Sequence, residues 1–474
     1  MFKTLAETRK ALFSGQTTTE QLTLHYLEVI RQKASLNAFL EVFEAEALDA
    51  AKEVDNKIAQ GTAGALAGMV IGIKDVLCFK GHKVSASSRI LEGFESLYTA
   101  TAVQRLIDAD AVIIGRLNCD EFAMGSSNEN SAYGNVLHPL DEKLAPGGSS
   151  GGSAVAVAAG LCLATLGTDT GGSIRQPASL CGITGMKPSY GTVSRWGCVA
   201  YASSFDQIGP MANSVEDCAA ILEVIAGPDE YDSTLRQIKP DAYTEKLVHT
   251  GTAKLAYFKQ YLESEGLDPE IKTAMLSLID RLRAQGHTVD ALEFPYLDYV
   301  IPVYYVLTTA EASSNLSRYD GIHYGYRNKE ANNLESTYKL SRTEGFGKEV
   351  KRRIMLGTFV LSSGYYDAYY SKAQKMRRLI RDYTQDVFKN YSFLILPSTP
   401  GTAFPLGGKS NDPIQMYLED IYTVQANICG VPAISIPGGI HSNGLPFGVQ
   451  LIADTGCDAA LLAFAARMQA ELQA

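Results

Sequence analysis

Histidine, tryptophan and closely spaced cysteine are scarce in this chain of 474 residues, which has 7 histidines, 8 cysteines and 1 tryptophan. No two cysteines form a Cys-x-x-Cys pair, and the histidines lack the spacing of metal ligands, so we expect neither a zinc site nor a disulfide scaffold. Positive charge is also in deficit, because 42 lysines and arginines oppose 52 aspartates and glutamates. The net charge of −10 predicts no overall attraction to nucleic acid.

A hydrophobic run long enough to cross a bilayer is missing as well. The longest run of small apolar residues, 154–166, is interrupted by Gly160, and we expect a buried helix from Ser150 to Leu166. The N-terminus, MFKTLAETRKALFSG, is amphipathic and too polar for a signal peptide. These features predict a soluble, cytoplasmic protein that makes no contact with a membrane.

Short apolar strands alternate with helix-like segments along the chain, which predicts an α/β fold around a mostly buried sheet. A helix is expected at 101–108, and strands at 68–76, 111–114, 393–396, 433–436 and 448–452. Residues 1–60 have a helical pattern with a capping box at Thr17 and Glu20. Residues 230–390 are predicted to form a largely helical, tyrosine-rich insertion, so we expect a single domain over 1–474.

Two local motifs resemble known functional loops but lack an essential part. Gly147-Gly-Ser-Ser-Gly151 matches the nucleophile elbow of α/β hydrolases, yet 138–146 has two prolines where that elbow needs a strand. The elbow would also require an aspartate and a histidine downstream. Gly407-Gly-Lys-Ser410 resembles the end of a phosphate-binding loop, but Ala403 replaces its first glycine. Neither motif therefore predicts a function.

Two loops rich in glycine and hydroxyl groups remain, APGGSSGGSA at 145–154 and GTDTGGSIRQPAS at 167–179. Both are embedded in apolar sequence, which is atypical of a flexible linker. In the second loop, successive backbone N–H groups beside Ser173 would suit an oxyanion hole. A serine nucleophile needs a base, and no histidine is near either loop.

Lys74 is the best candidate for that base because it ends an apolar strand that starts at Met69. A buried lysine can become neutral, since desolvation lowers its pKa, and it can then accept a serine proton. The alternative is a lysine whose ammonium reaches solvent at the strand edge. Asp75 would raise the lysine pKa if it were close, but on a strand its side chain should point to the opposite face.

Lys74 and the two serine loops together resemble the amidase signature family, whose members cleave amide bonds with a Ser-cisSer-Lys triad. The resemblance runs from about Gly68 to Pro210, and it implies a large central mixed sheet flanked by helices on both faces. It also implies that Ser173 is the nucleophile, that Ser149, after a cis peptide bond, relays the proton, and that Lys74 is the final base. The implied oxyanion-hole donors are the backbone N–H groups of Thr170, Gly171 and Gly172.

The rest of the chain resembles one branch of that family, the A subunits of glutamyl-tRNA(Gln)/aspartyl-tRNA(Asn) amidotransferases. The segments that carry the resemblance are 311–321, 342–357, 364–370 and 412–420. This resemblance implies a glutaminase that binds glutamine through Tyr304, Arg353 and Asp420, with Tyr305 as the alternative to Tyr304. An arginine can hold the α-carboxylate of glutamine, and an aspartate its α-ammonium.

The same resemblance implies a heterotrimer with B and C subunits, in which tRNA is held mainly by the B subunit. The released ammonia would pass to a partner that uses ATP and magnesium to amidate Glu-tRNA(Gln), Asp-tRNA(Asn) or both. We expect no metal or cofactor in this chain. Two alternatives stay open: a stand-alone amidase that hydrolyses small carboxylic amides, and a non-catalytic scaffold, which the intact triad positions disfavour.

Overall fold

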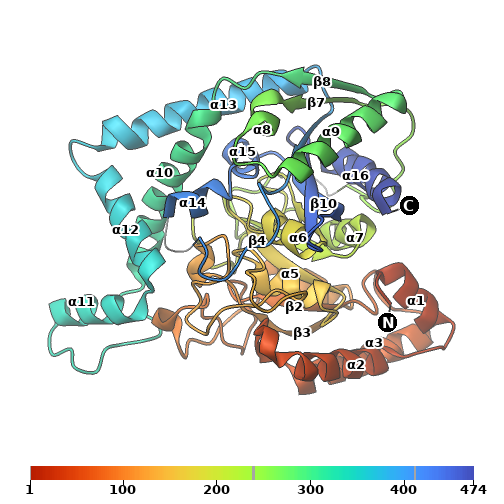
Figure 1. The fold of residues 1–474 in the computed structure, drawn as a ribbon. Coiled ribbons are helices and arrows are strands. Elements are labelled where there is room, and N and C mark those ends of the chain that lie inside the picture. The colour runs from red at the N-terminus through yellow and green to blue at the C-terminus, as the bar shows by residue number, and fades with distance from the viewer. Residues whose placement is uncertain (1, 238–240, 410–412, 474) are drawn as a thin grey trace.

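A mixed sheet of 11 strands runs through the computed structural model, which describes residues 2–237, 241–409 and 413–473 (Figure 1). In order across the sheet, the strands are β1 (Phe39–Val42), β3 (Val112–Leu117), β2 (Val70–Lys74), β4 (Ala164–Asp169), β6 (Gln207–Ala212), β5 (Thr184–Lys187), β10 (Ala433–Ile440), β11 (Pro446–Ile452), β9 (Phe393–Pro397), β7 (Lys254–Phe258) and β8 (Thr288–Leu292).

Parallel pairing is confined to two parts of this sheet. Strand β2 pairs in parallel with β3 and β4, and β7 pairs in parallel with β8 and β9. The other neighbouring strands are antiparallel. Every residue of β2, β3, β4 and β9 is buried, which explains their nearly continuous apolar sequence.

Helices pack around the sheet, so the predicted α/β fold with a large mixed sheet is confirmed. They are α1 (Leu5–Phe13), α2 (Thr19–Gln32), α3 (Glu44–Gln60), α4 (Thr101–Asp108), α5 (Gly151–Ala158), α6 (Arg175–Cys181), α7 (Val215–Ile225), α8 (Lys259–Glu263), α9 (Pro269–Ala284), α10 (Leu297–Asn315), α11 (Leu334–Gly345), α12 (Lys348–Leu361), α13 (Lys372–Phe388), α14 (Pro413–Leu418), α15 (Val424–Cys429) and α16 (Asp458–Gln473). No helix in the described ranges is long and apolar enough to cross a membrane.

The predicted helix over 150–166 is wrong in its second half. Helix α5 ends at Ala158, Gly160 adopts a φ of 70°, and the chain then enters β4 at Ala164. Small apolar residues suit a buried helix and a buried strand equally, so their pattern does not reveal where one ends. The capping box is also shifted by one residue, because Thr18 and Gln21 form it.

The segment predicted as a helical insertion contributes to both the sheet and the site. Strands β7 and β8 lie within 230–390 and form one edge of the sheet. Figure 1 shows α10 and α12 crossing closely on one side of the molecule. A Cβ on Gly357 of α12 would lie 1.9 Å from the carbonyl oxygen of Thr309 on α10, so only glycine permits this crossing. The two helices thereby bring Tyr304 and Arg353 into one region. Ser410 and Asp412, which belong to two of the sequence motifs, lie outside the described residues.

Candidate active site

Lys74, the last residue of β2, is completely buried and surrounded by hydroxyl groups. Its Nζ lies 2.7 Å from Ser149 Oγ, 2.9 Å from Ser150 Oγ and 2.9 Å from Thr168 Oγ1. Thr168 belongs to β4, which pairs in parallel with β2, so the carboxyl ends of both strands reach the same edge of the sheet. The structure thus brings Lys74 and Ser149 together and adds two hydroxyl groups.

Burial lowers the pKa of the Lys74 ammonium. The nearby thiols and carboxylates that oppose this shift are Cys119, Asp120, Cys198 and Asp169. The Asp75 carboxylate is held by other groups. It accepts hydrogen bonds from the backbone N–H of Ser87 at 2.7 Å and from Arg116 Nη1 at 2.6 Å. Asp75 lies one residue beyond β2, so these contacts, and not the alternation of a strand, fix its side chain.

The two serine loops meet beside this lysine. The peptide bond between Gly148 and Ser149 is cis, as the family resemblance implies. The backbone N–H of Ser150 donates to the Ser173 carbonyl at 3.1 Å, which ties the first loop to the second. Ser149 is fully buried, whereas Ser173 is 8% exposed, and Ser173 Oγ makes no hydrogen bond within the described residues. Of the three triad positions, only Ser173 has accessible surface.

The free backbone donors of the second loop differ from the predicted ones at one position. The N–H of Gly172 donates to Asp169 Oδ1 at 2.9 Å, so its predicted place among the oxyanion donors is not supported. The N–H groups of Thr170, Gly171 and Ser173 have no hydrogen-bond partner in the described part of the chain. Three backbone donors therefore remain beside the Ser173 hydroxyl.

Tyr304 lies against this loop. A Cβ on Gly171 would lie 2.4 Å from the Tyr304 hydroxyl oxygen, so glycine is required for the close approach. The hydroxyl of Thr423 donates to the Gly171 carbonyl at 2.6 Å from the other side. Tyr305, the alternative at the sequence level, points elsewhere, because its hydroxyl donates to Asp420 Oδ2 at 2.9 Å.

Asp420 is buried and bonded to two hydroxyl groups. Besides Tyr305, Ser126 Oγ donates to its carboxylate at 2.9 and 3.1 Å. Burial raises the pKa of Asp420 to about 7, although the hydrogen bonds from Tyr305 and Ser126 and the charge of Arg353 act in the opposite direction. A carboxylate in this setting gains much of its missing solvation from a bound cation.

Arg353, on α12, lies among aromatic rings close to Asp420. Its guanidinium carbon is 5.3 Å from the ring centre of Tyr305 and 5.7 Å from that of Tyr417. The rings of Tyr305 and Tyr417 are stacked with centroids 3.8 Å apart. Tyr305 therefore connects the guanidinium, through its ring, to the Asp420 carboxylate, through its hydroxyl.

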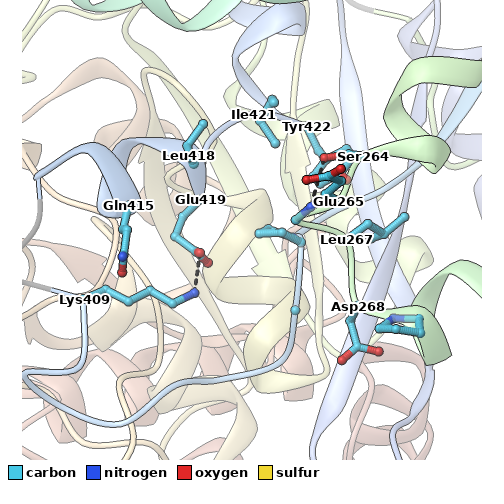
Figure 2. Close-up of a pocket in the computed structure, with 14 residues that line it drawn as sticks. Ser264, Glu265, Leu267, Asp268, Lys409, Gln415, Leu418, Glu419, Ile421 and Tyr422 are labelled. Atoms are coloured by element: carbon cyan, nitrogen blue, oxygen red, sulfur yellow. Dashed lines mark hydrogen bonds and ion pairs between the residues drawn. The ribbon is translucent and has the colours of Figure 1, made fainter.

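Glu419, the neighbour of Asp420, has a different set of partners. Glu419 forms an ion pair with Lys409 in a separate pocket of about 500 Å³ (Figure 2). That pocket is lined by the 264–269 loop, by 400–401 and by residues around α14. The ion pair with Lys409 holds Glu419, the residue next to Asp420 in the sequence.

A buried ion pair between Asp169 and Arg175, on either side of Ser173 in the sequence, was not predicted. Arg175 Nε and Nη2 donate to the two carboxylate oxygens of Asp169 at 3.0 and 2.9 Å, and both residues are fully buried. Burial would raise the pKa of Asp169, but Arg175 outweighs it and the pKa is about 2. Both residues lie in the segment GTDTGGSIR at 167–175, so their spacing could have indicated the ion pair. Ser126 lies in a loop without any comparable motif.

Comparisons with known proteins show which family the chain belongs to. A family model described as Amidase matches residues 21–462. The A subunit of the glutamyl-tRNA(Gln) amidotransferase from Chlorobium phaeobacteroides is 48% identical over 99% of both sequences, and that from Acidobacterium capsulatum is 50% identical over 95% of both. The crystal structure of the corresponding A subunit from Thermotoga maritima is 38% identical, with a TM-score of 0.77 over 95% of this chain and 90% of that one. The chain belongs to the amidase family.

Proposed function

We propose that this chain is the A subunit of a glutamyl-tRNA(Gln) amidotransferase and that it hydrolyses the side-chain amide of glutamine. The observation that carries the chemistry is the buried Lys74 within hydrogen-bond distance of Ser149, next to the more exposed Ser173. The family and the near full-length similarity to A subunits support the choice of substrate.

The contacts of Lys74 support a role as a base. A neutral amine has two N–H donors and one lone pair. The hydroxyl of Ser150 already donates to the Thr168 carbonyl at 3.1 Å, so Ser150 Oγ accepts from Nζ. We place the second N–H on Thr168 Oγ1, which leaves the lone pair of Nζ for Ser149 Oγ. Lys74 can then take the Ser149 proton while Ser149 takes that of Ser173.

Ser173 Oγ attacks the amide carbon of glutamine, and the carbonyl oxygen becomes an oxyanion. The backbone N–H groups of Thr170, Gly171 and Ser173 are the free donors placed to stabilise it. When the C–N bond breaks, the proton stored on Lys74 returns through Ser149 to the leaving nitrogen, which departs as ammonia. Water then attacks the glutamyl ester by the same path and restores Ser173.

Substrate binding uses the groups that line the other side of the site. Arg353 binds the α-carboxylate of glutamine, and Asp420 binds its α-ammonium. Tyr304, whose hydroxyl lies at Gly171, contacts the substrate close to the scissile amide. Tyr305 acts indirectly, because its hydroxyl is occupied by Asp420.

The released ammonia is used in a larger assembly. We propose a heterotrimer with B and C subunits, in the cytoplasm, in which the B subunit holds the tRNA and uses ATP and magnesium. The product would be Gln-tRNA(Gln), with Asn-tRNA(Asn) as a second product where the partner accepts Asp-tRNA(Asn). This chain itself would require no metal or cofactor.

Ammonia release from glutamine, measured with and without the B and C subunits, tests this proposal. We expect partners to increase the rate and Ser173→Ala to abolish it. Ser153→Ala is the matched control, because the Ser153 hydroxyl is buried and has no partner in the described residues. Glutamine hydrolysis that survives Ser173→Ala would exclude this nucleophile. Broad activity on small amides, with no gain from partners, would identify a stand-alone amidase instead.

A further inference from the structure

The guanidinium of Arg353 is held at one edge and open at another. Arg353 is 3% exposed, and its Nε donates to Glu349 Oε1 at 2.8 Å, one helical turn earlier on α12. Its Nη1 donates to the Tyr201 hydroxyl at 2.8 Å. Nη2 has no hydrogen-bond partner in the described ranges. Glu349 and Tyr201 thus determine the direction in which the free nitrogen points.

Glu349 also contacts the segment that carries Asp420. The Tyr417 hydroxyl donates to Glu349 Oε1 at 3.3 Å, the same oxygen that accepts from Arg353. Tyr417 lies on α14, three residues before Asp420, and its ring stacks on that of Tyr305. One carboxylate oxygen therefore connects α12, which supplies the guanidinium, with the segment that supplies the acidic group.

The charge of Glu349 is balanced from outside the site. Arg352 Nη1 donates to Glu349 Oε2 at 2.5 Å, and the Arg352 side chain is 37% exposed, whereas that of Glu349 is 11% exposed. Arg352 therefore offsets the negative charge that would otherwise repel a bound carboxylate. Glu349 can orient Arg353 without cancelling its attraction for an anionic ligand.

We propose that Glu349 is a positioning residue for the α-carboxylate of the substrate, acting through Arg353, while Tyr417 holds the Glu349 carboxylate in place. This inference rests on the proposed function, in which Arg353 and Asp420 bind the two charged groups of glutamine. These groups are on one carbon atom, so the guanidinium and the carboxylate must keep a fixed separation and orientation. Glu349 is the side chain that contacts both supporting elements.

The expected signature is a change in KM without a matching change in kcat. Glu349→Ala should raise the KM for glutamine about tenfold, the effect of losing one charge-assisted hydrogen bond to the binding group. Glu349→Gln should recover most of the affinity, because its amide oxygen can still accept from Arg353 and Tyr417. Asp382→Ala is the matched control, since Asp382 forms an exposed i,i+4 pair with Arg378 on α13.

Two further measurements separate positioning from a general structural role. In an Arg353→Ala background, adding Glu349→Ala should change the KM less than twofold, since the group to be oriented is gone. With 4-aminobutanamide, which lacks the α-carboxylate, Glu349→Ala and the unmodified protein should have the same kcat/KM. A loss of activity on that substrate, or additive effects in the double variant, would overturn the inference.

The outcomes also distinguish this inference from the proposed function. If Arg353→Ala raises the KM for glutamine and Glu349→Ala does not, Glu349 has no positioning role and the function stands. If Arg353→Ala leaves the KM unchanged, the assigned substrate site is wrong. A KM below that of the unmodified protein in Glu349→Ala would show that Glu349 competes with substrate for Arg353.

Discussion

At the scale of single residues, the pKa of the Asp420 carboxylate lies near neutrality. Burial opposes its ionisation, while two hydroxyl donors and a nearby guanidinium favour it, and the result is a pKa of about 7. Above pH 7 the Asp420 carboxyl is therefore mainly charged and can bind an ammonium, and below pH 7 it is mainly neutral and cannot.

We therefore expect kcat/KM for glutamine to fall about tenfold for each pH unit below about 7, through a rise in KM. The pH dependence of KM and of kcat should be measured separately, because protonation of Lys74 affects the chemical step. In Asp420→Asn the KM should be high and nearly independent of pH. An unchanged acid limb of KM in that variant would contradict the assignment.

At the scale of elements, the carboxylate of Glu121, which is distant in the sequence, accepts a hydrogen bond at the N-terminal end of α12. Glu121 accepts the N–H of Gly347, the residue before α12, at 2.8 Å, and also accepts from the Ser88 hydroxyl. A Cβ on Gly347 would lie 2.3 Å from Glu121 Oε2, so the contact depends on glycine. An anion is favoured at this end of a helix because the first N–H groups lack intrahelical partners.

Glu121→Ala should lower the free energy of unfolding by about 1–3 kcal/mol, because the Ser88 hydroxyl and the Gly347 N–H lose their buried acceptor. Denaturant titration measures this loss. Glu335→Ala, at the exposed first turn of α11, is the control and should change stability by less than about 0.5 kcal/mol. Equal losses in the two variants would rule out the capping role.

Sequence patterns predicted some elements better than others, for a physical reason. Strands β2, β9 and β11 were found because continuous apolar runs of strand length indicate burial on both faces. The end of α5 was missed, since alanine and valine fit either state in a core. Strands β7 and β8 were missed within a region dominated by polar helices.

In the candidate site, too, some residues could be predicted from local sequence and others could not. Ser149 and Ser173 lie in the two glycine-rich loops and Lys74 ends an apolar strand, and the resemblance of these segments to the amidase signature family was sufficient to select all three. The contact of Glu349 with Tyr417 joins positions 68 residues apart and has no local signature. Whether Tyr304 or Tyr305 faces the nucleophile loop also depended on how α10 is rotated against that loop. Tertiary packing decides such contacts, and no single segment encodes them.

At the scale of the whole molecule, one guanidinium joins parts that the sheet keeps apart. Arg175 binds Asp169 at the end of β4, and it also donates to Asn427 on α15 at 2.6 Å and to Gln450 on β11. Strands β4 and β11 are separated by three other strands. Because the Asp169 carboxylate has a lowered pKa, its contribution to stability is present above about pH 4 and is lost as the pH falls toward 2.

Arg175→Met should lower the free energy of unfolding at neutral pH by about 3–5 kcal/mol, because it leaves Asp169 buried without its counter-charge. Arg31→Met removes an exposed partner of Glu44 and should cost less than about 1 kcal/mol. Both losses in the free energy of unfolding should be measured by equilibrium denaturation at pH 7. Similar, small losses in the two variants would show that the buried pair does not stabilise the fold.

The side chains of Ser149, Ser150 and Ser173 differ in solvent accessibility, and this has a consequence for chemical labelling. Ser149 and Ser150 have no exposed surface, and Ser173 has a small one. Of these three serines, an electrophile that reacts with activated serines, such as a sulfonyl fluoride, can reach only Ser173, whereas Ser149 and Ser150, which contact the Lys74 amine, are out of its reach. A single adduct per chain would therefore count the accessible Ser173 hydroxyls in a preparation.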